Sequence, residues 1–269
     1  MADPLYDPPP PGVTPAGKSL LDRLVHALLP APCLGCGEPL PAAGAALGLC
    51  TRCRSALAPL PREACAVCAR PLAAYALPDD YRCGACRERP PGFDRLVALW
   101  SYRPPLDAVV QGLKFRRLDY LGSHLAAALA KGLGGRLAGF DSIVPVPLHW
   151  RRRLARGYNQ AERIARPLAG LLGLPCGLLL SRSRATPPQS LLGKADRLAN
   201  LRKAFRVPRP ERVRGLRILL VDDVATTGAT LDAAAAALKN AGAAAVTALV
   251  AGRTPLEPTR LREIEPVRE

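Results

Sequence analysis

ILLVDDVATTGAT, residues 218–230, is the stretch of this 269-residue chain that decides its fold. Its first four residues are apolar and β-branched at both ends, which predicts a short buried strand. Asp222 and Asp223 follow, and then a loop of threonine, alanine and glycine leads into a helix rich in alanine and leucine. A strand that feeds a loop and a helix is the unit of parallel α/β sheets, whose ligands bind at the carboxyl ends of the strands. The stretch therefore predicts a parallel sheet with a ligand-binding loop after one of its strands.

The residues of this loop favour a ribose phosphate as the ligand. Backbone N–H groups converge at the start of the following helix, where the helix dipole attracts an anion. Gly228 allows close approach of the backbone, and threonine hydroxyls donate to phosphate oxygens. Asp222 and Asp223 would repel a phosphate, so we expect them to accept hydrogen bonds from ribose hydroxyls. An ordinary turn with two solvated acids is the alternative, and it accounts less well for the full pattern. The predicted ligand-binding residues are Asp222, Asp223, Ala225, Thr226, Thr227, Gly228, Ala229 and Thr230.

Eight of the nine cysteines form four Cys-x-x-Cys pairs, which predicts two zinc sites. Two near-equal repeats of a pair, a gap and a pair are typical of sites with four cysteine ligands, and a disulfide framework or a redox pair fits less well. Sequential and crossed pairing both fit the spacing. Four thiolates leave no open position on the metal, so we expect structural zinc. Cys176 stands alone and is expected to be a small buried thiol. The predicted ligands are Cys33, Cys36, Cys50, Cys53, Cys65, Cys68, Cys83 and Cys86.

Composition limits the class of protein. With 49% hydrophobic residues the chain can bury a sizeable core, and its formal net charge is +16. This charge suggests nucleic acid or another phosphate-rich partner, although an arginine-rich genome would produce the same excess. No apolar run reaches the roughly 18 residues of a transmembrane helix. The N-terminal residues do not have the pattern of a signal peptide, so the cytoplasm is the expected location.

Prolines and glycines divide the chain into four expected parts. They are a disordered proline-rich tail over 1–18, a double zinc ribbon module over 19–90, an α/β domain over 91–253 and a charged tail over 254–269. Residues 20–29 are expected to form a short amphipathic helix. In the α/β domain we expect strands over 96–102, 141–146, 178–180, 216–221 and 244–251. We expect helices from 104, over 121–133 and over 230–241, and a mostly helical segment over 153–172.

Two basic segments are candidates to contact a polyphosphate. The first follows the strand over 141–146, where guanidinium groups can hold a pyrophosphate. The second, over 182–206, has the composition of a lid that closes over such a ligand. The alternatives are a solvated basic helix start and an exposed polar linker. The candidate residues are Arg151, Arg152, Arg153, Arg182, Arg184 and Gln189.

Residues 12–19 match the Walker A pattern, but the context does not support a nucleotide-binding P-loop. A P-loop needs a strand directly before its glycines, and residues 8–11 are all proline. The segment also leads toward the cysteine pairs and not toward a second parallel strand. We therefore do not expect an ATPase.

The order of these motifs resembles the ComF family, in which a double zinc ribbon precedes a phosphoribosyltransferase-like domain. The resemblance covers about residues 30–253. It rests on the Cys pairs, Tyr102 with Leu113-Lys114-Phe115, Val-Pro-Val-Pro at 144–147, Arg156-Gly-Tyr-Asn-Gln160, Arg-x-Arg-x-Thr-x-x-Gln at 182–189 and the loop of 218–230. That loop is similar to the phosphoribosyl pyrophosphate (PRPP) loop of type I phosphoribosyltransferases. The resemblance implies a sheet of that kind, with the 5′-phosphate of PRPP at 226–230, its pyrophosphate at the 145–153 turn, and Mg²⁺ bound with it.

The same resemblance implies a role in DNA uptake and natural transformation. Single-stranded DNA would be handled in the cytoplasm, beside a DNA-uptake helicase or a recombination mediator. The alternative is a catalytic phosphoribosyltransferase of nucleotide metabolism or salvage, and a pure zinc scaffold is less favoured. No acceptor pocket, amidotransferase domain or general base is recognisable in the sequence, so no transfer reaction is assigned.

Overall fold

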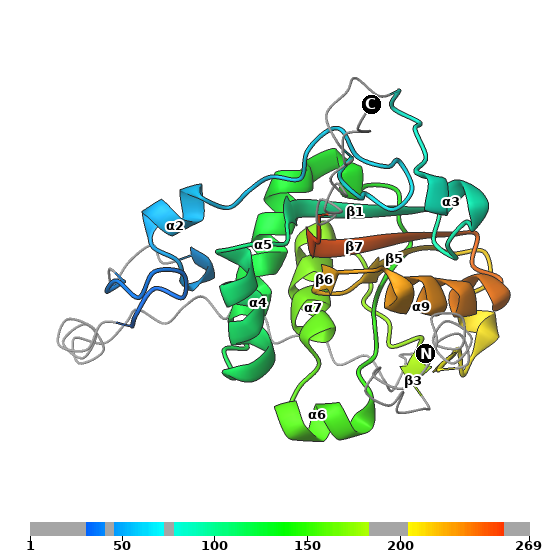
Figure 1. Ribbon diagram of the computed structural model, residues 1–269. Helices are drawn as coiled ribbons and strands as arrows, with labels where there is room; N and C mark the ends of the chain where they lie inside the picture. Colours follow the sequence, from blue (N-terminus) through cyan, green and yellow to red (C-terminus); the bar gives the residue numbers. More distant parts are fainter. Residues whose placement is uncertain (1–30, 41–45, 73–77, 183–203, 256–269) are drawn as a thin grey trace, which may run out of the picture.

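The computed structural model describes residues 31–40, 46–72, 78–182 and 204–255, and a parallel sheet lies at its centre (Figure 1). The strand order is β1-β7-β5-β2, with β6 paired to the end of β7, and every one of these pairs is parallel. The predicted parallel α/β fold is therefore confirmed. The strands are β1 (Arg95–Ser101), β2 (Ser142–Pro145), β5 (Arg217–Val221), β6 (Val224–Ala225) and β7 (Ala245–Arg253).

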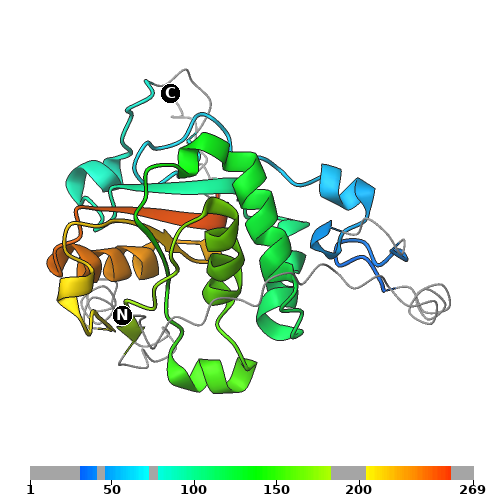
Figure 2. The ribbon, with the colours of Figure 1, turned by 180° about the vertical axis from the view of Figure 1, so that it is seen from behind.

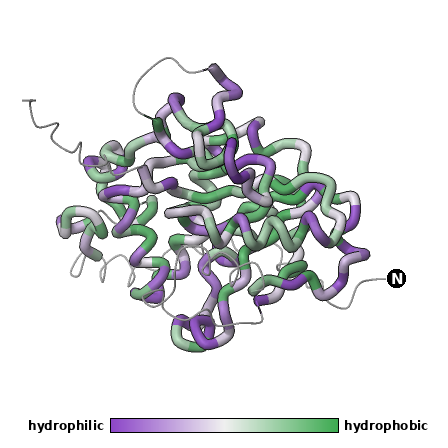
Figure 3. Tube along the Cα trace, turned by 45° about the vertical axis from the view of Figure 1, so that its right-hand side comes forward, coloured by the Kyte–Doolittle hydropathy of each residue, from purple (hydrophilic) through white to green (hydrophobic). Residues whose placement is uncertain are grey.

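Helices cover both faces of this sheet (Figures 1 and 2). Successive residues of a strand point to opposite faces, so Ile218 and Leu220 pack with the core around α9, whereas Leu219 packs with the core around α5 and α7. The most hydrophobic segments accordingly lie in the middle of the molecule (Figure 3). One face of the sheet is covered by α4 (Leu106–Phe115), α5 (Leu121–Leu133) and α7 (Gln160–Leu172). The opposite face is covered by α9 (Ala229–Asn240).

Short helices complete the described part of the chain. They are α2 (Thr51–Ser55), α3 (Gly84–Glu88), α6 (Trp150–Arg156) and the 3₁₀ turns Ala46–Gly48, Gly134–Leu137 and Pro210–Arg212. None of the helices in these described ranges has the length and apolarity that a bilayer crossing requires.

Both edges of the sheet are covered by other segments of the chain. Along β1, the backbone N–H of Leu60 donates to the carbonyl of Leu99 at 3.1 Å, and the N–H of Leu96 donates to Val67 at 2.7 Å. Along β2, the N–H of Ile143 donates to Pro175 at 2.9 Å. Unpaired sheet edges promote association with other chains, so these segments protect the fold.

One of the predicted elements is wrong, and the others differ from the structure only at their ends or by a short break. The segment over 153–172 is mostly helical, as expected, but it is divided into two helices, α6 and α7, because Gly157 adopts a left-handed conformation with φ of 83°. The side chain of Asn159 then caps α7 by accepting a hydrogen bond from the N–H of Ala161.

The strand expected over 178–180 is displaced. The chain first runs beside β2 through a bridge between Cys176 and Ile143, and the strand follows as β3 (Ser181–Arg182). It pairs antiparallel with β4 (Phe205–Arg206) in a separate two-stranded sheet. The apolar run suggested a strand, but Leu178 is 56% exposed and has no place in the core.

Other predictions fall outside the described residues. They concern the tail over 1–18 with its Walker-like segment, the helix over 20–29, Arg184, Gln189 and the charged tail beyond residue 255.

The contact between α5 and α7 gives a test of the packing. A Cβ at Gly122 of α5 would lie 2.5 Å from the carbonyl oxygen of Arg163, whereas a Cβ at Gly170 of α7 would have nothing within 4 Å. We expect Gly122→Ala to lower the free energy of unfolding by about 1–3 kcal/mol, because overpacking forces the helices apart. Gly170→Ala should raise it by about 0.4–1 kcal/mol, because alanine restricts the unfolded chain. Urea unfolding measures both, and equal effects of the two substitutions would contradict the packing described.

Candidate functional site

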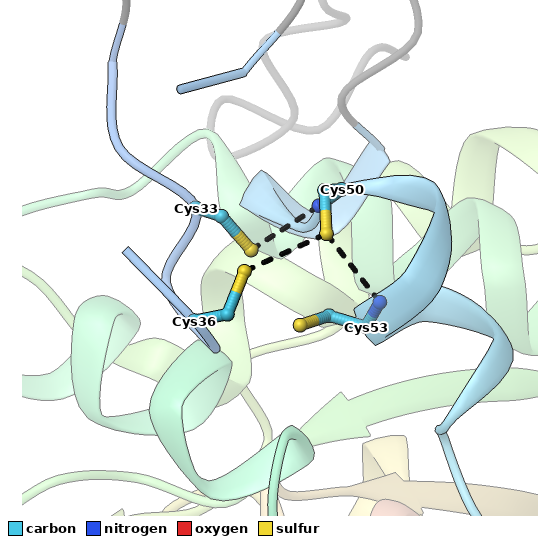
Figure 4. Close-up of side chains that lie close together, drawn as sticks. All are labelled: Cys33, Cys36, Cys50 and Cys53. Carbon is cyan, nitrogen blue, oxygen red and sulfur yellow. Dashed lines mark hydrogen bonds between the residues drawn. The ribbon is translucent and has the colours of Figure 1, made fainter. Parts of the chain in front are cut away.

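The first four cysteines of the paired set lie together in one cluster (Figure 4). It consists of Cys33, Cys36, Cys50 and Cys53, whose Sγ atoms all lie within 4.8 Å of one another. The Sγ atoms of Cys36 and Cys50 are 3.7 Å apart. This first cluster lies against α4 and α5, where the backbone N–H of Leu47 donates to Nδ1 of His124 at 3.1 Å.

The second cluster consists of Cys65, Cys68, Cys83 and Cys86, all of them buried. The Sγ atoms of Cys68 and Cys83 are 3.8 Å apart. The four pairs therefore combine sequentially and not in the crossed arrangement, which the spacing alone could not decide. This cluster packs with the core on the α9 face of the sheet.

Both clusters suit structural zinc. A tetrahedral zinc with Zn–S bonds of about 2.3 Å sets its sulfur atoms about 3.8 Å apart, which agrees with the two separations above. Backbone N–H groups donate to the sulfurs, from Cys50 to Cys33 at 3.2 Å and from Cys83 to Cys65 at 3.3 Å. Such donors favour the thiolate form that binds metal. Four cysteine ligands occupy every position of the metal, so neither cluster is suited to metal catalysis.

The two adjacent acids lie at the carboxyl end of β5 and have different environments. Asp223 is buried, and its Oδ1 forms a salt bridge with Nζ of Lys114 at 2.9 Å. Asp222 is partly exposed. Its N–H donates to the carbonyl of Leu249 at 3.0 Å, and its Oδ1 accepts from the N–H of Asp223 at 2.9 Å. The strand ladder thus continues through Asp222, while the contacts with the N–H of Asp223 and with Lys114 hold the two carboxylates.

The loop that follows opens the N-terminus of α9. Val224–Ala225 pairs with the end of β7, and Thr226 and Thr227 are exposed. Gly228 has φ of 83° and caps the helix, and the Oγ1 of Thr227 accepts a hydrogen bond from the N–H of Ala229 at 3.3 Å. A residue with a side chain would be strained at this φ, which explains why glycine is needed here.

One of the predicted arginines, Arg182, is close enough to the acids to interact with Asp222. Burial lowers the pKa of Arg182 and the charge of Arg152 lowers it further, while Asp222 acts in the opposite direction. The guanidinium of Arg182 lies 5.3 Å from the centre of the Phe205 ring. Arg182 is thus close enough to interact with Asp222 at the end of β5, and Arg152 is close enough to interact with Arg182.

The other two candidate arginines of the first basic segment, Arg151 and Arg153, contact side chains outside the pair of acids. Arg151 lies over the ring of Trp150 at 5.3 Å, and Arg153 is 4.0 Å from a carboxylate oxygen of Glu162. Both belong to α6, a helix without a buried residue.

Sequence reasoning missed two side chains that belong to this site, Lys114 and Tyr102, whereas Arg156 is one of the arginines of the basic segment that follows the strand over 141–146. Lys114 is paired to Asp223, and the charge of Asp223 also acts on Arg156 and on Tyr102. The motifs that contain them were used only as signs of resemblance. The one available signal was that Lys114 directly follows the buried Leu113 near the end of a helix that packs on the sheet.

Burial, followed by the charge of Asp223, raises the pKa of Asp222 to about 7. Lys114 and Arg182 oppose this shift only in part. Without a ligand, the site therefore does not readily hold two negative charges at neutral pH. A ligand hydroxyl or a cation would relieve the repulsion between the carboxylates.

Cys176 lies outside both clusters. Burial raises the pKa of its thiol to about 11, so the reactive thiolate is scarce at neutral pH. The side chain is only partly buried, so the expectation of a buried thiol is met in part.

Comparison with known proteins agrees with this architecture. The double zinc ribbon domain matches residues 24–87, and the phosphoribosyl transferase domain matches residues 154–261. The DNA utilization protein YhgH of Salmonella typhimurium is 39% identical over 219 residues, which cover 74% of this chain and 94% of that protein.

Two competence proteins are also similar. Competence protein F of Haemophilus influenzae is 32% identical, over 72% of this chain and 86% of that protein. Competence protein ComFC of Bacillus subtilis is 29% identical, over 73% of this chain and 80% of that protein.

The raised pKa of Asp222 predicts a pH-dependent effect on stability. Because the pKa is higher in the folded than in the unfolded chain, the ionised carboxylate opposes folding. This penalty grows as the pH rises from about 4 to about 7, and it vanishes only below about pH 3, where the carboxyl is protonated in both states. We expect Asp222→Asn to raise the Tm of the ligand-free protein by roughly 2–4 °C at pH 8 and to leave it unchanged near pH 3.

Calorimetric melting at both pH values measures this difference. Asp80→Asn, at an exposed position, controls for the change in net charge. A gain from Asp222→Asn that is the same at both pH values would contradict the prediction.

Proposed function

Because the chain belongs to the ComF family, which includes competence protein F and the DNA utilization protein YhgH, we propose that it binds PRPP with Mg²⁺ and handles single-stranded DNA during DNA uptake in the cytoplasm. The observation that carries the ligand proposal is the pair Asp222–Asp223 next to a glycine-capped helix N-terminus. An anion site beside two carboxylates suits a molecule that carries both phosphate and hydroxyl groups.

In this proposal each part of PRPP would have a partner in the site. The N–H groups and hydroxyls of the loop from Thr226 to Thr230 would bind the 5′-phosphate. Asp222 and Asp223 would accept hydrogen bonds from the ribose hydroxyls, with Lys114 balancing the charge of Asp223. Arg152 and Arg182 would contact the pyrophosphate, to which Mg²⁺ binds through oxygen ligands.

The DNA proposal is supported by an exposed surface beside this site, which we call the α4–α6 surface. It consists of Phe115, Arg116, Arg117, Trp150, Arg151 and Arg153. Phe115 is 68% exposed and Trp150 is 56% exposed, so neither side chain is used in the core. The guanidinium of Arg156 lies 4.9 Å from the Phe115 ring and joins the two helices. Aromatic rings stack on bases and arginines contact phosphates, which is how proteins bind single strands without sequence preference.

A catalytic phosphoribosyltransferase is the second candidate, because the same arrangement of acids and arginines would serve a reaction in which pyrophosphate leaves the ribose. Release of pyrophosphate from PRPP in the presence of a purine base, a pyrimidine base or an amine would identify this activity.

PRPP binding is tested by calorimetric titration in the presence of Mg²⁺. We expect Asp222→Ala/Asp223→Ala to weaken binding at least tenfold, because hydrogen bonds to charged groups contribute about 1.5–3 kcal/mol each. Asp79→Ala/Asp80→Ala removes two exposed acids elsewhere and should leave the affinity unchanged. The proposal fails if PRPP does not bind, or if both double variants bind it equally well.

DNA binding is tested by fluorescence anisotropy of labelled oligothymidine at several salt concentrations. Trp150→Ala should weaken binding by about 1–3 kcal/mol, the usual contribution of one stacked base. Arg151→Glu/Arg153→Glu should weaken binding and reduce its salt dependence, because fewer counterions are released. Lys131→Glu/Arg136→Glu changes the net charge equally at exposed positions elsewhere. Equal losses in the two charge-reversed variants would show that the α4–α6 surface has no special role.

A further inference from the structure

The side chain of Arg253 connects the ligand-binding loop with the second cysteine cluster. Arg253 is the last residue of β7 and is only 1% exposed. Its Nε donates to the carbonyl of Cys68 at 3.0 Å. Its Nη1 donates to the carbonyl of Ala225 at 2.9 Å and also to that of Thr226. One buried guanidinium thus joins a metal-ligand residue to two residues of the loop.

A cation in this position needs compensation. Removing a guanidinium from water is costly unless it is paired and hydrogen-bonded. The carbonyl groups supply hydrogen bonds but no net charge. Zinc with four thiolates carries a net charge of −2, so metal loading of the second cluster provides a counter-charge close to Arg253.

The contacts also determine the direction of the loop amides. In a trans peptide the carbonyl of one residue and the N–H of the next point in opposite directions. Because the carbonyls of Ala225 and Thr226 point toward Arg253, the N–H groups of Thr226 and Thr227 point away from it. Both threonines are exposed, so these donors are oriented in advance for an anion at the surface of the loop.

We propose that Arg253 is a positioning residue that couples zinc in the second cluster to ligand affinity in the loop. The proposal rests on the proposed function, because the ligand of the loop is taken to be PRPP. Zinc fixes the Cys68 carbonyl, the carbonyl holds the guanidinium, and the guanidinium holds the loop. Such coupling is reciprocal, so PRPP also retains zinc in the second cluster.

The first cluster is an internal control for this coupling. It lies against α4 and α5, on the opposite face of the sheet from the core that contains the second cluster. A general stabilisation by ligand would protect both clusters, whereas coupling through Arg253 protects the second cluster selectively.

The experiment follows zinc loss from each cluster of the zinc-loaded full chain. A zinc-selective chelator and a thiol-alkylating reagent are added with Mg²⁺, with or without saturating PRPP, and mass spectrometry of peptides gives the alkylation rate of each cysteine. We expect PRPP to slow alkylation of Cys65, Cys68, Cys83 and Cys86 about fivefold or more, the usual lower range of allosteric coupling, and to leave the first cluster unchanged.

Two variants separate positioning from a general structural role. Arg253→Met removes the donors and should abolish the selective effect of PRPP on the second cluster. Arg253→Lys keeps the charge and one donor group and should restore part of it. A residue that only stabilises the fold would change alkylation equally with and without PRPP, so the ratio of the two rates would stay as in the wild type. If Arg253→Met does not fold, the test compares the wild type with Arg253→Lys. The quantity compared is the ratio of the alkylation rates of the second cluster without and with PRPP.

The outcomes distinguish this proposal from the proposed function. If PRPP binds the wild-type chain by calorimetry but does not slow alkylation of the second cluster, or slows both clusters equally, the coupling is overturned and the ligand site stands. If PRPP does not bind, both proposals are overturned together.

Discussion

The pairing of β7 on both of its sides is the constraint on which the rest of the structure depends. This strand pairs in parallel with β1 along one side and with β5 along the other, and β6 joins near its end. Its position sets where β5 ends and therefore where Asp222 and Asp223 lie. Its own last residue, Arg253, contacts both the loop and the second cysteine cluster. The buried sheet and the candidate site are thus built from the same hydrogen-bonded ladder.

The candidate site places the carboxyl groups of Asp222 and Asp223 next to each other, which is unfavourable for folding unless a positive charge lies nearby. Two adjacent acids at a strand end repel each other, and burial raises the pKa of Asp222 further. Lys114, from a helix on one face of the sheet, offsets the charge of Asp223 through a 2.9 Å salt bridge. A buried pair of this kind contributes little net stability, because desolvation offsets much of the attraction. The salt bridge between Lys114 and Asp223 is therefore better explained by a role in ligand binding than by a role in folding.

The two cysteine clusters have different relations to the sheet. The first lies against α4 and α5, with Cys36 exposed, whereas the second is buried in the core of the other face. The segment between them, which includes Leu60, covers the edge of β1. A chain segment with little core of its own gains its order from metal and from the sheet that it covers.

The sequence by itself determined the parallel strand–loop–helix unit at 218–230, the helix over 121–133 and the membership of the cysteines in metal sites. These features depend on residues close together in the chain, where periodicity and spacing carry the information. The sequence could not determine the break between α6 and α7, because glycine and asparagine, the residues at positions 157 and 159, also occur inside continuous helices. Only the tertiary structure decided the sequential pairing of the cysteine pairs, the salt bridge of Lys114 and the contacts of Arg253, whose partner Cys68 is 185 residues away in the chain. Such contacts follow from strand order, and strand order is a property of the whole sheet that no local pattern contains.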